Sequence, residues 1–378
     1  PISWNEIPVS FVDALFTSTS AVCVTGLATI DISACFNRTG QAVIMALVQL
    51  GGLGIITYSS LFMFLWRKRV SLTDRLSVGR ALMHDPSFDL GRFMLILLAV
   101  TLSLETLGFI AILLSAPELP FFSALFLAVS SFCNAGFALL PDNLMSYRTN
   151  VGINLAVCGL ITFGGIGFAV IEDLLWLIRC KFLGIKYRLS LASRVIISVS
   201  ALLTFGGAAV VFCLESLAGH DYGGMKANIL SALFQSVTCR TAGFNTVPIA
   251  HMSTVALVFM ILLMFIGGSP GSCAGGIKTT TARVLASFIK NRFLYRHQVS
   301  LGQRAANLAT LNNAITLFIF ALLTVVTAVF ILLITESSTP DADMNHQLFL
   351  NVLFEVTSAF GTVGLTMDFT PTLTSIGK

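Results

Sequence analysis

The stretch "SAVCVTGLATID", residues 20–31, places a small-residue turn around Gly26 directly after a short apolar segment. An α-helix needs about 20 apolar residues to cross a hydrocarbon core of about 30 Å, and this segment is shorter. Glycine tolerates a positive φ and lacks a Cβ, so successive carbonyl groups around it can turn toward one axis. The surrounding chain must explain why a short apolar helix ends on such a turn.

The whole chain has the composition of an integral membrane protein. Of its 378 residues, 56% are hydrophobic and 11% are charged, and the mean hydropathy is +0.89. Soluble domains carry about a quarter charged residues. Long apolar runs predict helices, and the period-two alternation of a membrane barrel is missing. We predict an all-α membrane protein with spans at 42–66, 93–114, 154–178, 195–214, 255–266 and 314–334.

The opening stretch is one of four copies of a single pattern. The copies read "DALFTSTSAVCVTGL" (13–27), "SALFLAVSSFCNAGF" (123–137), "SALFQSVTCRTAGF" (231–244) and "NVLFEVTSAFGTVGL" (351–365). Each continues from Leu-Phe through small hydroxyl residues to a glycine turn, and the third is one residue shorter. A double glycine follows the first three copies, in "QLGGLGI", "TFGGIGF" and "FIGGSPG". The repeat predicts four units of helix, re-entrant pore helix with loop, and helix (M1-P-M2).

The four units predict one pore with pseudo-fourfold symmetry. We place the repeats at 1–70, 89–183, 193–297 and 306–378; the first starts without an M1 and the last stops without an M2. Irregular backbone at membrane depth must be buried in protein or line a watery cavity. A single glycine turn is more often a helix-packing contact, but four copies favour a pore lining. The predicted lining residues are Val24, Thr25, Gly26, Asn134, Ala135, Gly136, Thr241, Ala242, Gly243, Thr362, Val363 and Gly364.

The run "GGSPGSCAGGIKTTT", residues 267–281, interrupts the second helix of the third unit. A Gly, Ser and Thr run in mid-membrane cannot form a stable helix, so it predicts a hinge or gate, with a plain kink as the alternative. Lys278 either meets the cytoplasm or repels a cation. The predicted gate residues are Gly267, Gly268, Ser269, Gly271, Ser272, Gly275, Gly276 and Lys278.

Charge gives the orientation. Most of the 22 Lys and Arg residues lie in connections 67–92, 179–194 and 278–304, which the positive-inside rule places in the cytoplasm, with the pore loops open to the outside. This distribution explains the net charge of +4 and gives no reason to expect nucleic acid binding. The eight cysteines form no paired motif and are predicted to be reduced. The sequence contains no HExxH, Walker or GxSxG motif, so no motif in it predicts an enzyme.

Several charged residues lie close to the predicted pore. Asp31, Asp142 and Asp368 follow three of the turns, either as a cation-concentrating mouth or as solvated carboxylates. Glu105 lies inside a predicted span, where an ion site or a hydrogen bond bracing a pore loop is possible, and we favour the brace. Bracing is also our interpretation of Glu355 and Arg240.

The motifs "TSAVCVTGL", "QLGGLGI", "QSVTCRTAGFNT" and "GGSPGSCAGGIKTTT" resemble the Trk/Ktr/HKT superfamily of potassium transporters, and most of all its KtrB membrane subunits. The resemblance covers nearly the whole chain. It implies four linked units around one pore, a K⁺ filter to which each loop glycine contributes, and a gate at the intramembrane loop. In plant relatives a serine at the first position goes with Na⁺ preference, so glycine in all four loops implies K⁺.

The resemblance also implies the setting. The expected assembly is a homodimer in the plasma (inner) membrane lipid bilayer, sitting on a cytosolic nucleotide-binding regulatory subunit of KtrA/TrkA type. K⁺ is the transported ion and no cofactor is expected. The alternatives are a Na⁺- or H⁺-coupled potassium symporter on the same fold and, from other classes, an intramembrane enzyme or a purely structural subunit.

Overall fold

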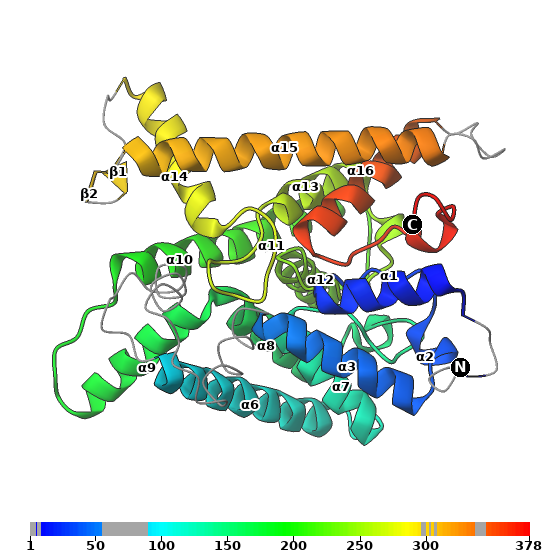
Figure 1. The fold of residues 1–378 in the computed structure, drawn as a ribbon, viewed down its shortest axis with the longest axis horizontal. Coiled ribbons are helices and arrows are strands. Elements are labelled where there is room, and N and C mark those ends of the chain that lie inside the picture. The colour runs from blue at the N-terminus through cyan, green and yellow to red at the C-terminus, as the bar shows by residue number, and fades with distance from the viewer. Residues whose placement is uncertain are drawn as a thin grey trace.

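The chain folds into a bundle of helices. The structure is a computed structural model that describes residues 5, 9–54, 90–295, 300–301, 304–305, 308–336 and 345–378. In Figure 1, α15 (Leu308–Glu336) runs along one edge and α6 (Leu90–Ser115) along the opposite edge, with α12 (Met225–Thr238) between them. A small hairpin pairs β1 (Ser300–Leu301) with β2 (Arg304–Ala305).

Three helices in the described part are long and apolar enough to cross a membrane. They lie at Leu95–Ser115, Leu191–Leu217 and Leu308–Glu336, so the spans predicted at 93–114, 195–214 and 314–334 are confirmed. The second of them is built from α10 (Leu191–Ala201), a π-helical turn η2 (Leu202–Gly206) and α11 (Gly207–Leu217).

The span predicted at 154–178 is not one straight helix. It consists of α8 (Val151–Ile166) and α9 (Phe168–Phe182), which meet at an angle of 103°. Gly167 lies at the break with a φ of +93°, a conformation that L side chains rarely adopt. The hydropathy of the run is continuous, so the bend was invisible to a prediction based on length and apolar content.

Each repeat contains one short apolar helix, here called its pore helix. The pore helices are α1 (Phe11–Val22), α7 (Phe121–Cys133), α12 and α16 (Asn345–Gly361). The helices that follow the first three, α3 (Arg38–Leu53), α8 and α13 (Thr254–Phe265), each begin at a side-chain cap. The capping residues Asn37, Asn150 and Ser253 accept a backbone amide of the first turn, which stabilises an N-terminus.

The packing runs around the bundle in chain order. Helix α3 contacts pore helix α7, α8 contacts α12, and α13 contacts α16, so each second helix rests on the pore helix of the next repeat. Fully buried phenylalanines from the second and third repeats fill the core at this seam: Phe126, Phe132, Phe234 and Phe244. This pattern links each of the first three repeats to the next one along the chain.

The remaining elements connect these helices. They are α2 (Ile32–Cys35), η1 (Met145–Tyr147), η3 (Ile249–His251), α14 (Thr279–Phe293) and η5 (Thr370–Thr372). The predicted span at 42–66 is described only as far as Gly54, and the basic connection 67–92 lies almost wholly outside the described residues.

Candidate functional site

The four repeated turns share one backbone conformation. We call them filter loops 1 to 4: residues 24–26, 134–136, 241–243 and 362–364. In each loop the first residue has a positive φ, between 50° and 69°, and the closing glycine has one between 72° and 89°. Positive φ is uncommon for non-glycine residues, above all for β-branched ones such as Val24. Its recurrence at four equivalent positions shows that the surrounding fold imposes one turn geometry.

The filter loops touch one another in a closed ring. A Cβ built on each loop glycine would fall under 3.0 Å from a carbonyl oxygen of another loop. The pairs are Gly26 with Ala135, Gly136 with Ala242, Gly243 with Val363, and Gly364 with Thr25. The loops therefore follow each other in chain order and the fourth closes on the first. The structure brings together all four triplets that the sequence predicted.

Filter loops 1 and 4 are held by the same hydrogen bonds. In each, the middle amide donates to a serine carbonyl of the pore helix at 2.8 Å, and the glycine amide donates to the hydroxyl of that serine at 3.1 Å. The serines are Ser20 and Ser358. In loop 2 the carbonyl of the equivalent Ser130 accepts in the same way, but its hydroxyl has no partner among the described residues.

Filter loop 3 is attached differently because its repeat is one residue shorter. The Ala242 amide donates to the Thr238 carbonyl at 3.0 Å, one residue closer in sequence than in the other loops. The Thr238 hydroxyl donates to the carbonyl of Phe244 at 2.6 Å, beyond the glycine. Arg240, next to this loop, donates to the preceding spanning helix.

The double glycines lie where the second helices meet the pore loops. A Cβ on Gly51 or Gly164 would collide with a carbonyl oxygen at the end of the same repeat's pore helix, Val22 or Phe132 respectively. Glycine is required for this close approach. In the third repeat the same Cβ, on Gly267, would collide instead with a carbonyl of the irregular loop that follows.

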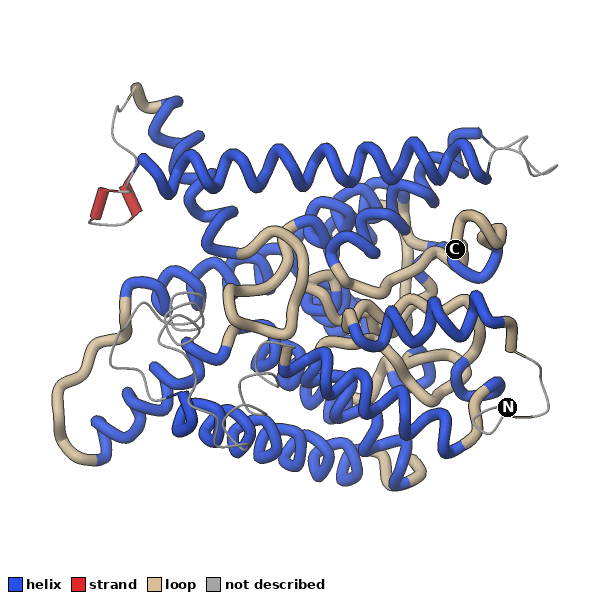
Figure 2. The backbone as a smooth tube through the Cα atoms, viewed as in Figure 1, coloured by secondary structure: helices blue, strands red, loops and turns tan. Residues whose placement is uncertain are grey.

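That irregular loop, residues 266–278, joins α13 to α14 and lies among the helices (Figure 2). The Gly275 amide donates to Thr362 Oγ1 in filter loop 4 at 3.1 Å. The Ser269 amide donates to the Gly165 carbonyl at 3.1 Å, near the bend between α8 and α9. The predicted segment 267–281 is irregular through Lys278, while its last three residues begin α14; the irregular part contacts the second and fourth repeats.

Lys278 closes this loop on itself. Its ammonium donates to the Ala274 carbonyl at 2.5 Å. Ser269 also holds the loop, because its carbonyl accepts from the Ser272 hydroxyl at 2.6 Å and its hydroxyl accepts from Thr279 at 3.2 Å. Whether Lys278 meets the cytoplasm or repels a cation stays a prediction.

Two buried carboxylates, those of Glu105 and Glu355, accept hydrogen bonds from residues near the filter loops. Glu105 on α6 accepts from Gln49 Nε2 at 2.9 Å, and Gln49 Oε1 accepts from the Cys133 thiol at 3.6 Å, next to filter loop 2. Glu355 on α16 accepts from the hydroxyls of Thr366 and Thr370 after filter loop 4. These contacts agree with the bracing interpretation of both residues.

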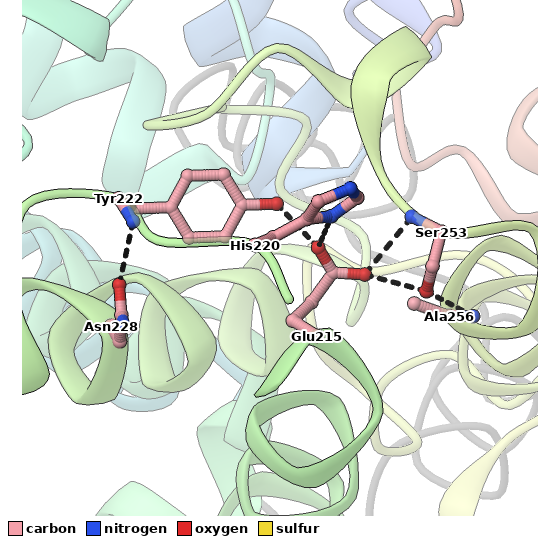
Figure 3. A network of polar contacts seen from close by, with 6 residues as sticks. All are labelled: Glu215, His220, Tyr222, Asn228, Ser253 and Ala256. Atoms are coloured by element: carbon pink, nitrogen blue, oxygen red, sulfur yellow. Dashed lines mark hydrogen bonds and ion pairs between the residues drawn. The ribbon is translucent and has the colours of Figure 1, made fainter. Parts of the chain in front are cut away.

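Glu215 forms a third brace, which the sequence prediction missed (Figure 3). Its carboxylate, at the end of α11, accepts from His220 Nδ1 at 2.7 Å, from the Tyr222 hydroxyl, and from the Ser253 amide and hydroxyl at 3.0 and 2.7 Å. Burial, followed by the bond to Glu215, raises the pKa of Tyr222 above its usual range. The only signal in the sequence was one acidic residue in the apolar run "VVFCLESL".

The acidic residues predicted near the mouth make local hydrogen bonds. Asp31 caps α2 by accepting the Ser33 amide at 2.7 Å, and Asp142 accepts the Ser146 amide at 2.8 Å. Asp368 is exposed. The eight cysteines are free, as predicted; Cys133 and Cys239 are buried, and Cys23 is exposed.

Comparison with known proteins identifies the class. The family profile described as "TrkH: Cation transport protein" matches residues 2–378. The "Potassium/sodium uptake protein NtpJ" of Enterococcus hirae is 38% identical over 97% of this chain and 80% of its own length. The "Ktr system potassium uptake protein B" of Bacillus subtilis is 36% identical over 100% of this chain and 83% of its own length.

A solved structure agrees. The crystal structure of the potassium transporter TrkH from Vibrio parahaemolyticus covers 95% of this chain with a TM-score of 0.67 and 20% sequence identity, and the match spans 77% of that protein. The protein is therefore a multi-pass membrane transporter and not an enzyme. It belongs to the TrkH family of cation transport proteins.

Proposed function

We propose that this chain carries K⁺ into the cell through one pore, and that the ring of filter loops 1 to 4 is its selectivity filter. The ring carries the proposal: four glycine turns of one conformation meet in a closed circle. Rings of backbone carbonyls replace the hydration shell of K⁺ in channels. The name of the Bacillus subtilis relative, a potassium uptake protein, supports the choice of ion, while the name of the Enterococcus hirae relative includes both potassium and sodium.

Uptake of ⁸⁶Rb⁺ into proteoliposomes that hold the full natural chain tests this proposal, with K⁺ or Na⁺ as the competitor. We expect K⁺ to block uptake and Na⁺ to have little effect. Gly26→Ser should weaken this preference, because a Cβ there would collide with the Ala135 carbonyl of the next loop. Gly219→Ser is the matched control, since Gly219 also has a positive φ but has open space around it. Equal preference in Gly26→Ser and the native chain contradicts the filter.

Coupled symport is the second candidate, favoured by the name of the relative that takes up potassium and sodium. The same vesicles distinguish the two functions. Under a uniporter, an imposed Na⁺ or H⁺ gradient changes ⁸⁶Rb⁺ uptake only through the membrane potential. Under a symporter, the gradient drives uptake while the potential is clamped.

We also propose that residues 266–278 gate the pore. The bond from Gly275 to Thr362 joins this loop to filter loop 4, and the bond from Ser269 to Gly165 joins it to the second repeat. A segment without helical hydrogen bonds can rearrange at lower cost than the helices that flank it. Its rearrangement would alter access to the filter from one side.

The basic connections are proposed to face the cytoplasm. Lys181, in the last turn of α9, is exposed, as are Lys186 and Arg188 between α9 and α10; the positive-inside rule retains such residues in the cytoplasm. There they would meet the proposed nucleotide-binding regulatory subunit, below a homodimer of this chain. Cross-linking from Lys186 in native membranes tests this arrangement, and labelling of Lys186 only from outside the cell contradicts it.

A further inference from the structure

Arg240 places a guanidinium directly beside filter loop 3. It precedes Thr241 in the chain, and the residue is buried, with 7% of its surface exposed. Among the residues that the structure describes, the ion pairs join other groups, and no carboxylate pairs with Arg240. A buried charge without an opposite charge must be stabilised by hydrogen bonds. The partners of Arg240 therefore indicate what its side chain does.

Those partners lie on the spanning helix that opens the third repeat. Nη2 donates to Ser200 Oγ at 3.0 Å, and Nη1 donates to the Ser200 carbonyl and to Thr204 Oγ1, each at 3.4 Å. The two nitrogens of the guanidinium fork thus hold the helix at the point where α10 becomes the π-helical turn η2. Because both guanidinium nitrogens donate, they restrict the orientation of the arginine side chain relative to the helix as well as its distance from it.

The π-helical turn also receives the pore helix. The Ser236 hydroxyl of α12 donates to the carbonyls of Leu203 at 3.1 Å and Thr204 at 2.8 Å. Gly207, just after the turn, has no side chain in the way: a Cβ there would lie 2.5 Å from Ser236 Oγ. Single π-helical turns are rare and mark places where a side chain enters the helix ladder. Here the turn presents oxygen atoms to both the pore helix and Arg240.

We propose that Arg240 is a positioning residue that ties filter loop 3 to the π-helical turn of the spanning helix, and that this tie sets the K⁺ over Na⁺ preference of that loop. The inference rests on the proposed function of the ring as a filter. In loops 1 and 4 a serine hydroxyl holds the glycine amide. In loop 3 the Thr238 hydroxyl donates to the Phe244 carbonyl instead. The loop is connected to the neighbouring helix through the hydrogen bond from Arg240 to Ser200.

Competition of K⁺ and Na⁺ against ⁸⁶Rb⁺ uptake, in proteoliposomes of the full natural chain, tests the proposal. We expect Arg240→Gln and Arg240→Lys each to lower the K⁺ over Na⁺ preference about tenfold, because lysine keeps the charge but not the fork. Lys226→Gln is the matched control: it removes an exposed positive charge from α12, the pore helix that precedes filter loop 3, and the preference should stay.

Two outcomes overturn the proposal. An unchanged preference in Arg240→Gln shows that the tie does not shape the filter. A native preference in Arg240→Lys, together with a loss in Arg240→Gln, shows that the charge acts through space and the fork is irrelevant.

A smaller change keeps the test decisive if the Arg240 variants do not fold. Ser200→Ala removes the acceptor of Nη2 and leaves the carbonyl, so we expect a loss of preference of about threefold. An unchanged preference in Ser200→Ala overturns the proposal. Where Arg240→Gln does fold, the two changes should be non-additive.

Gly243→Ser, measured in parallel, separates the two proposals. If it alters the preference while Arg240→Gln does not, only the role of Arg240 is wrong. If neither alters it, the ring is not the filter.

Discussion

Repeats 2 and 3 carry the same double glycine in the same place, and the structure uses it differently. In repeat 2, Gly164 lets helix α8 rest on the carbonyl end of its own pore helix. In repeat 3, Gly267 rests on Gly275 of the irregular loop, and helix α13 ends before the doublet. The comparison teaches that one motif allows a close approach to the pore helix where a helix continues through it, and a close approach within an irregular loop where the helix stops.

The filter loop of repeat 3 also differs from those of the other repeats. Repeats 1, 2 and 4 hold their loops through a pore-helix serine five residues before the middle amide. Repeat 3 is one residue shorter. Its Arg240 bonds to Ser200 and to Thr204 in the π-helical turn, and its Glu215 bonds to Ser253, the cap of α13.

The largest expected effect is on the packing glycine of repeat 2. Gly164→Ala should lower the free energy of unfolding by roughly 1–3 kcal/mol, because the Cβ would overlap the Phe132 carbonyl. The thermal midpoint in detergent measures it. Gly159→Ala, in the same helix with open space around its Cβ, should keep or slightly raise the midpoint. Gly267→Ala should cost less than Gly164→Ala, since the loop can move; equal losses break the comparison.

Glu215→Gln tests whether repeat 3 needs the hydrogen bonds that join the end of α11 to the start of α13. The amide would present an N–H₂ group to donors that now point at a carboxylate, so we expect a loss of about 1–3 kcal/mol in the free energy of unfolding. The midpoint in detergent again measures it. Glu118→Gln, an exposed glutamate, should change little. A midpoint equal to that of the native chain would show that this brace is not needed.

Thr362→Val tests the joint between the irregular loop and filter loop 4. It removes the oxygen that accepts the Gly275 amide. Under the proposed gating, the arrangement seen here then loses about 1 kcal/mol and resting ⁸⁶Rb⁺ uptake should rise about fivefold. Thr324→Val, on the exposed surface of α15, is the control. Resting uptake equal to that of the native chain contradicts gating by this contact.

The smallest expected effect concerns the loop serines. Ser358→Ala removes the hydroxyl that accepts the Gly364 amide, and the K⁺ over Na⁺ preference should fall about fivefold or less. Ser130→Ala should leave it unchanged, because that hydroxyl has no partner among the described residues. Competition of ⁸⁶Rb⁺ uptake measures both. Equal behaviour of the two variants would mean that the hydroxyl bond does not hold loop 4.

Much of the fold was predictable because it depends on local properties. Apolar runs of sufficient length specified three spans, and the repeated motif located four pore helices and four turns. The bend at Gly167 was missed, since the prediction rested on the length and apolar content of the whole run, and the two helices pass that test together. Glu215 was missed because its partners come from two other segments of the third repeat, the loop 220–222 and Ser253 before α13.

The sequence by itself determined the membrane character, the repeat and the glycine turns, because hydrophobic length and backbone freedom are properties of a residue and its neighbours. Only the tertiary structure decided that the turns close a ring in chain order, that Lys278 bonds to its own loop, and that Arg240 meets a π-helical turn. These contacts join segments distant in the chain, and packing selects which donors and acceptors meet.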